Sequence, residues 1–431
     1  MPDLASLVDA RHRLAREEMG ELGIVWPAAD GSAPRGDRAV GRERVPQDQL
    51  PEAARRFAFE LAAAERGLGL FEWWAAWLTS VGSHPTADPR GALRAASVTT
   101  VDRAAGASID AALRRDLADL VDVAVEVAGR RAALEHDHHL TRSGVGAVLT
   151  TLEVFLDDTR DAYEGVVGRG VCPRRAAEVY ARLAADGRAC ALSQSSALAL
   201  VVGDRSVSSW LDGSTSTVHR GRCGGASSVA RFPLRGTDIL LGPHTGVRAG
   251  LELLHEVAHA IHHDLLFRFE PAGRAAFPDA LWMETWAHLV EHLGGVGVAG
   301  HVARRSLVLA RVHAVRALYG WLALDRGRTP GELDALLREL YGHHLGAAPP
   351  PCDVVTDLFG AQQNLLRAQA LAAAAVLGSA PDVAPAGKSP SELFAAMLHW
   401  AVGLDGTSLS MLADGTAAEV LGRAVRAGSA A

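Results

Sequence analysis

The sequence predicts a mainly α protein with a small β-sheet near the middle of the chain. Over most of its length, Ala-rich and Leu-rich runs carry apolar residues at steps of three and four, as amphipathic helices do. One central stretch instead holds short β-prone segments bounded by Gly, Ser and Pro. The chain has 431 residues, of which 48% are apolar and 22% charged. This is the balance of an ordinary globular protein with room for a large core.

The N-terminal half is predicted to be helical after a short linker. Residues 5–19 have the pattern of a helix, whereas residues 25–49 are rich in Pro, Gly and charge and are typical of a loop. The apolar spacing then favours helices as far as about residue 195. We therefore divide the chain into an N-terminal helix and linker (1–50), a helical region (51–195) and a third region (196–431).

The third region is predicted to begin with the sheet and continue as helices. The β-prone segments are 197–204, 227–234 and 237–242. From residue 247 to about 378 the pattern is helical again. A loop at 379–390 and one or two final helices follow.

Charge and hydropathy exclude some classes of partner. The net charge of -7 argues against nucleic acid, because phosphate binding needs a basic face. The most apolar run, 370–378, is too short to span a bilayer, and the first twenty residues lack the apolar core of a secretory signal. We expect a cytoplasmic protein with no membrane partner. Its four cysteines form no CxxC pair and are expected to be reduced thiols.

The segment 251–266, LELLHEVAHAIHHDLL, contains an H-E-x-x-H motif at His255, Glu256 and His259. Residues four apart lie on one face of a helix, so both imidazoles can bind one metal ion. Glu256 is then close enough to act on a water at that metal. Zn²⁺ suits two imidazoles, and a catalytic zinc keeps one position open. The flanking residues are apolar, so burying these polar groups would be costly unless a metal satisfied them.

A third protein ligand is expected from the segment 279–293, DALWMETWAHLVEHL. Glu284, His288 and Glu291 are spaced four and three apart, so they share one helix face. By spacing alone, any of the three could reach the metal.

The motif and the residues after it resemble the thimet oligopeptidase and oligoendopeptidase F family of zinc peptidases. That family carries H-E-F-G-H-x-x-H and a Glu ligand 25 residues after the second motif histidine. Here the motif is HEVAHAIH, and Glu284 lies 25 residues after His259. Glu291 follows Glu284 by seven residues, again as in the family.

The resemblance implies a site and a fold. It implies one Zn²⁺ ion held by His255, His259 and Glu284, with Glu256 as the general base. It also implies a helical zinc-peptidase fold, with a deep cleft between two helical halves and the small sheet before the motif helix. The expected residues around the ligands, which would orient them, are His262, Glu291 and His288.

One part of the family pattern is missing. The family's late helix carries a His and several Tyr that bind substrate and donate to the oxyanion, but the corresponding stretch here, 354–369, has neither residue type. Losing one oxyanion donor costs about 10²–10³ in rate. Candidates for replacing these groups in substrate binding are Gln363, Asn364, Tyr341 and His344. Candidates for binding a substrate carboxylate are Arg220, Arg222 and Arg231.

The sequence thus favours a zinc-dependent hydrolase that cleaves an amide bond of a short peptide-like substrate, which the strand at 237–242 would hold by backbone pairing. An alternative is a repurposed zinc enzyme for a small non-peptide or modified amino-acid substrate in a biosynthetic pathway, since the late His/Tyr motif is absent. A third reading is a non-catalytic protein with structural zinc. Glu256 argues against it, because a structural site needs no base.

Overall fold

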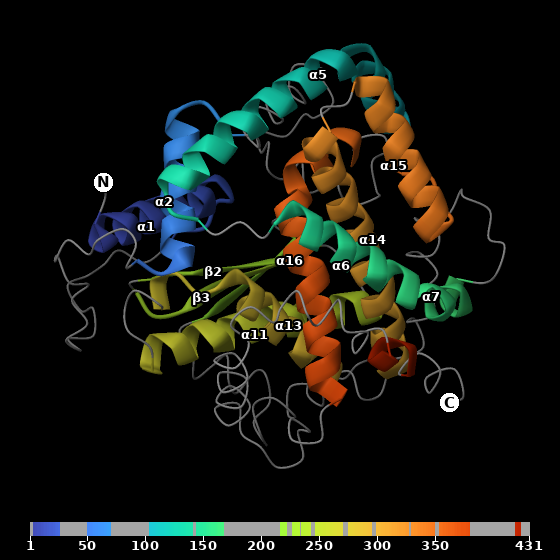
Figure 1. Cartoon of the computed structure of the whole chain (residues 1–431). Helices are drawn as coiled ribbons and strands as arrows, with labels where there is room; N and C mark the ends of the chain where they lie inside the picture. The colour runs from blue at the N-terminus through green and yellow to red at the C-terminus, as the bar shows by residue number, and fades with distance from the viewer. Residues whose placement is uncertain are drawn as a thin grey trace.

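The computed structural model shows a mainly α protein with a small sheet (Figure 1), as predicted. It describes residues 3–25, 50–69, 103–140, 144–167, 216–221, 226–232, 234–242, 246–269, 275–294, 299–326, 329–349, 353–379 and 419–423. The predicted strand at 197–204 and the predicted loops at 25–49 and 379–390 lie outside these residues, except for residues 25 and 379.

The N-terminal half contains helices α1 (Leu4–Glu21), α2 (Glu52–Glu65), α5 (Arg103–Asp137), α6 (Val145–Asp158) and α7 (Arg160–Val167). Helix α1 begins where Asp3 accepts a hydrogen bond from the Ser6 amide at 2.8 Å, which satisfies one of the free amides of the first turn. The long helix α5 reaches from the neighbourhood of α2 to α15 at the top of Figure 1.

The sheet has three described strands, β1 (Thr217–Arg220), β2 (Ser227–Ala230) and β3 (Thr237–Leu241), in the order β1-β3-β2. Strand β3 is buried along its whole length and pairs parallel with β1 and antiparallel with β2. Strands β2 and β3 lie in predicted segments, whereas β1 was not predicted, because its residues belong to a polar run.

The central place of β3 corrects one prediction. A substrate cannot pair with the strand at 237–242, because both of its hydrogen-bonding edges are already occupied by β1 and β2.

The C-terminal half contains α11 (Gly246–Phe269), α13 (Ala280–Gly294), α14 (Ala299–Arg326), α15 (Pro330–Leu345) and α16 (Asp353–Ser379). Helices α14 and α16 pack along each other. At Gly320 of α14 an added Cβ would lie 2.5 Å from the Cβ of Ala361, so only glycine allows this approach. Helix α15 begins with a capping box, in which Thr329 and Glu332 exchange hydrogen bonds.

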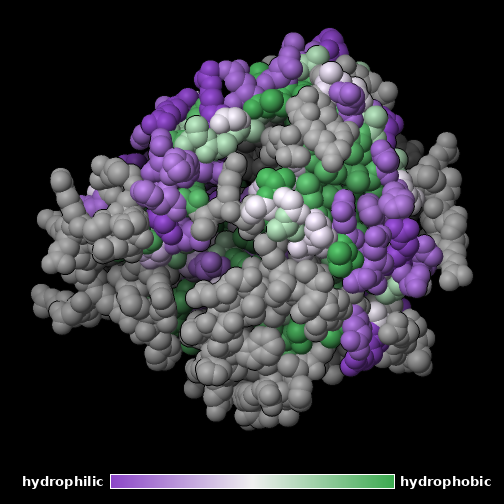
Figure 2. All heavy atoms as spheres, in the orientation of Figure 1, coloured by the Kyte–Doolittle hydropathy of each residue, from purple (hydrophilic) through white to green (hydrophobic). Residues whose placement is uncertain are grey.

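Two large apolar clusters lie on either side of α16. One includes buried side chains of α5, α6, α14, α15 and α16, and the other includes β3, α11, α13 and the end of α16. Helix α16 contributes to both, so it connects them. Figure 2 shows hydrophilic side chains over the outer faces of α5 and α15 and hydrophobic ones inward of them. None of the described helices has the length and apolarity needed to cross a bilayer.

A buried arginine joins three of these helices. Arg311 of α14 donates to the carbonyl of Leu156 and the hydroxyl of Thr159 at the end of α6, and to the carbonyl of His344 at the end of α15. The side chain is fully buried, and its guanidinium lies 4.8 Å from the ring of Tyr163. These contacts satisfy carbonyls that a helix leaves free at its C-terminal end.

Candidate metal centre

Helices α11 and α13 pack together and bring the three predicted metal ligands to one point. His255 and His259 lie one turn apart on α11, and their Nε2 atoms are 3.1 Å apart. The Glu284 carboxylate of α13 lies 3.5 Å from His255 Nε2 and 3.8 Å from His259 Nε2. One ligand atom from each residue lies within 4.8 Å of the others. These are two imidazoles and one carboxylate, the donor set of a catalytic zinc site.

The hydrogen bonds around the histidines fit a bound cation. His255 Nδ1 lies 2.7 Å from the Glu291 carboxylate, an acceptor, so Nδ1 carries a proton and the neutral form of the ring has its lone pair on Nε2. This Nε2 faces His259 Nε2, where a cation can accept both lone pairs. His259 Nδ1 is buried and has no hydrogen-bond partner among the described residues. The residues present therefore fit a zinc ion.

Glu291 is held as a carboxylate beneath the site. Its side chain is almost fully buried and contacts the Arg305 guanidinium, and His288 Nδ1 lies 3.2 Å away. Burial alone would raise the pKa of Glu291, but the charges of Arg305 and His288 and the hydrogen bonds from both histidines hold it well below its usual value. Glu291 and His288 thus lie where residues that orient His255 were predicted. His262 is buried on α11, where its ring stacks on that of His263 with centroids 6.3 Å apart.

Glu256 is buried next to the ligands, within electrostatic range of His255 and Glu284. Only 5% of the residue is exposed, and burial raises the pKa of its carboxyl group to about 7, against the opposing effect of His255. Ser228 of β2 places its hydroxyl 2.8 Å from Glu256 Oε2 and 2.8 Å from the Glu256 carbonyl oxygen. Ser228 was missed from the sequence, because only the packing of β2 against α11 shows this contact.

The polar residues predicted on α16 have different surroundings. Gln363 is exposed, whereas Asn364 is buried and places its Oδ1 3.0 Å from His313 Nδ1. His313, on α14, is a second residue that sequence reasoning missed. Tyr341 is buried, and its hydroxyl donates to Asp353 at 2.8 Å.

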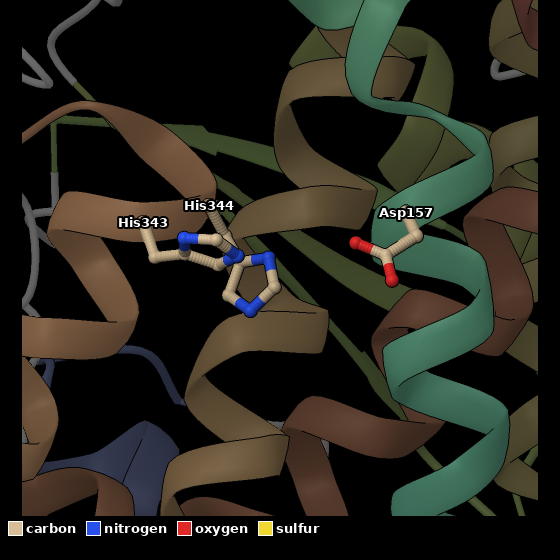
Figure 3. Close-up of side chains that lie close together, drawn as sticks. All are labelled: Asp157, His343 and His344. Atoms are coloured by element: carbon tan, nitrogen blue, oxygen red, sulfur yellow. The ribbon is translucent and has the colours of Figure 1, made fainter.

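His344 belongs to a separate group with Asp157 and His343 (Figure 3). Asp157 comes from α6 and the two histidines from the end of α15. Arg160 donates to Asp157 at 2.7 Å and lies 3.0 Å from His343 Nε2. Figure 1 shows α15 far from α11, so the structure does not bring Tyr341 or His344 to the metal ligands. Tyr341 is engaged with Asp353 and His344 with the group around Asp157, so their role in substrate binding stays a prediction.

The arginines predicted to bind a carboxylate also have other surroundings. Arg231 is buried and makes two hydrogen bonds to Asp238, at 2.6 and 2.7 Å, so its carboxylate partner lies within the sheet. Arg220 is exposed at the end of β1, and Arg222 lies outside the described residues.

Comparison with known proteins agrees with this architecture. No protein-family model matches the sequence, and no curated protein matches it. Among solved structures, the chain is similar to a crystal structure described as a "putative oligoendopeptidase F" from Bacillus anthracis str. Ames. The TM-score is 0.51 with 13% sequence identity, and the alignment covers 89% of this chain and 76% of the other. The chain therefore has an oligoendopeptidase-like, mainly α fold.

Proposed function

We propose that the protein is a zinc-dependent hydrolase that cleaves an amide bond of a short peptide-like substrate. The observation that carries the proposal is the convergence of His255, His259 and Glu284 beside the buried carboxylate of Glu256. The oligoendopeptidase-like fold supports the same class of enzyme.

Each residue of the site has a part in this proposal. Bound zinc would lower the pKa of a water molecule and polarise the scissile carbonyl. Glu256 accepts the proton of the attacking water and passes it to the leaving nitrogen. Ser228 orients the Glu256 carboxylate by hydrogen bonding, and Glu291 fixes the ring of His255.

The edge of β2 is a suitable place for an extended substrate. Among the described strands, β2 pairs only with β3, and we propose that its other edge takes part in backbone pairing with the substrate. Ser228 of β2 bonds to Glu256, so a peptide on this edge would lie close to the general base. We therefore propose that β2, and not β3, pairs with the substrate.

A second candidate is a zinc enzyme repurposed for a small non-peptide or modified amino-acid substrate in a biosynthetic pathway. It is favoured by residues 354–369, which contain no Tyr or His, and by the engagement of Tyr341 with Asp353. This enzyme would bind zinc in full but cleave no member of a broad peptide library, whereas efficient cleavage of unmodified peptides would exclude it.

Replacing Glu256 with Gln tests the proposed function. The variant keeps the size of the side chain but cannot accept a proton, so kcat for short peptides should fall by about 10²–10⁴ while zinc content stays at one ion. Glu252→Gln, one turn earlier on α11, is the matched control and should cleave at the wild-type rate. Wild-type turnover by the Glu256→Gln variant would contradict the assignment of the base.

A further inference from the structure

Arg367 lies on the side of α16 that faces α13. It precedes Gly378 by eleven residues, about three turns, so the two residues share one helix face. At Gly378 this face packs on α13, because an added Cβ would lie 3.5 Å from His292 Cβ and 3.6 Å from Leu289 Cδ1. Arg367 is therefore on the same stripe of α16, nearer to the start of the helix.

The Arg367 side chain is accessible to solvent although much protein surrounds it. The residue is exposed, yet desolvation is the largest influence on its pKa and lowers it. The charge of Glu284 raises this pKa, and the charge of Arg316 lowers it. An exposed cation thus lies within electrostatic range of the third metal ligand.

No carboxylate pairs with Arg367 among the described residues, in contrast to its neighbour Arg316. Arg316 lies 2.6 Å from Asp357 and 3.8 Å from Asp353, which neutralise it. The Glu284 carboxylate would be engaged by a bound metal. Arg367 therefore retains a planar fork of N–H donors and an uncompensated charge, which is the usual recognition group for a carboxylate.

A hydrogen-bond acceptor is provided by His313 of α14, which contacts α16 at Asn364. Asn364, one turn before Arg367, directs its amide nitrogen to Asp357 at 3.4 Å, so its Oδ1 accepts from His313 Nδ1 at 3.0 Å. His313 Nδ1 then carries the proton, and Nε2 is left as an acceptor. His313 therefore contacts α16 one turn before Arg367. Burial lowers the pKa of His313, and the charge of Arg367 lowers it further.

We infer that Arg367 anchors the carboxylate of the substrate, which makes the substrate class short peptide-like molecules with a free C-terminal carboxylate. The last residue of such a molecule presents both a carboxylate and an amide N–H. The carboxylate binds Arg367, and the N–H donates to His313 Nε2. The position of Arg367 near Glu284 places the cleaved bond close to the C-terminal end. This inference rests on the proposed function and names its substrate.

Carboxylate binding by Arg367 can be tested by measuring ligand affinity in a variant that does not cleave the ligand. Zinc-loaded Glu256→Gln protein is titrated by calorimetry with two pairs of ligands. One pair is a hexapeptide as its free acid and as its C-terminal amide. The other is N-benzoylglycine and its amide, which reports on carboxylate binding even if the protein is not a peptidase. Each titration is repeated with Arg367→Gln, Arg367→Lys and the control Arg338→Gln, an exposed arginine of α15 paired with Asp334.

We expect each acid to bind about 10- to 100-fold more tightly than its amide, because a charged hydrogen-bond pair is lost in the amide. Arg367→Gln should abolish this preference, Arg367→Lys should restore part of it, and Arg338→Gln should leave it unchanged. An acid preference that survives Arg367→Gln, or no preference in either pair, would overturn the anchor. If only the N-benzoylglycine pair shows the Arg367-dependent preference and no peptide binds or is cleaved, the anchor stands and the peptidase proposal fails.

Discussion

Among the described residues there are three groups of two histidines and one carboxylate. One of them, His255, His288 and Glu291, shares His255 with the predicted ligands, and the other two differ in what surrounds them. In each group, one ligand atom per residue lies within 4.8 Å of the others. The first, His255, His259 and Glu284, is buried to half-buried on α11 and α13. The second is Asp157, His343 and His344, where two of the three residues are exposed on α6 and α15 (Figure 3).

The difference lies in the neighbouring charges. At the first group an anion, Glu291, is hydrogen-bonded to His255 Nδ1. The Nε2 atoms of His255 and His259 then face each other. At the second group a cation, Arg160, already lies between Asp157 and His343. A metal ion there would meet like charge. Donor type and spacing are alike in the two groups, and only the partners of the donor atoms favour a metal ion at the first.

The largest expected effect is on zinc affinity when a ligand of the first group is removed. We expect His259→Ala to weaken zinc binding by about 10³-fold, since the apparent binding energy of zinc is shared among a few ligands. His344→Ala is the matched control from the second group and should leave the affinity unchanged. Competition with a chromogenic chelator measures both. Equal losses in the two variants would remove the distinction between the groups.

A smaller effect is expected from the supporting anion. Glu291→Gln keeps an acceptor for His255 but removes the charge, and loss of such a partner typically costs 10- to 100-fold in metal affinity. The same titration measures it. Zinc binding that is as tight as in the wild type would mean that Glu291 contributes to packing only.

Acid should weaken zinc binding at the first group. Burial would lower the pKa of His255, but Glu284 and Glu291 raise it well above 6.5 in the metal-free protein. Protons therefore compete with zinc below this raised pKa, so the competition starts above pH 6.5. The apparent Kd should rise about tenfold per pH unit as one proton is displaced. Titrations between pH 8.5 and 6 test the sign, and a Kd that is constant over this range would contradict it.

The smallest effect is expected in the second group. Asp157 and Arg160 are exposed, so their ion pair contributes about 0–1 kcal/mol. Asp157→Asn should change the free energy of unfolding in urea by no more than this and should leave zinc stoichiometry at one ion. A loss of bound zinc in this variant would show that the second group, and not the first, holds the metal.

The same contrast explains how much the sequence could predict. Helical periodicity located the helices, and the i, i+4 spacing of His255 and His259 with Glu284 on the next segment was sufficient to predict a group that does converge. Helical periodicity depends on residues close together in the chain, and the spacing of the metal ligands follows from a sequence motif. Strand β1 and the hydroxyl of Ser228 were missed, because their roles depend on which strand packs beside which.

The residues around the site needed the tertiary structure for the same reason. Tyr341 and His344 have side chains that could bind a substrate, but they lie on α15, which packs against α14, α16 and α5. The sequence does not show which helices α15 packs against. His313 was overlooked because it lies in an ordinary amphipathic helix. Only its 3.0 Å contact with Asn364 distinguishes it.

Arg311 has a consequence for how the protein can move. Its single guanidinium joins α14 to the ends of α6 and α15, so these three helices cannot separate without exposing several buried polar groups at once. They should behave as one rigid block. A motion that separates the two apolar clusters would then take place between this block and the elements α11, α13 and β3, and α16, which contributes to both clusters, would lie at the boundary.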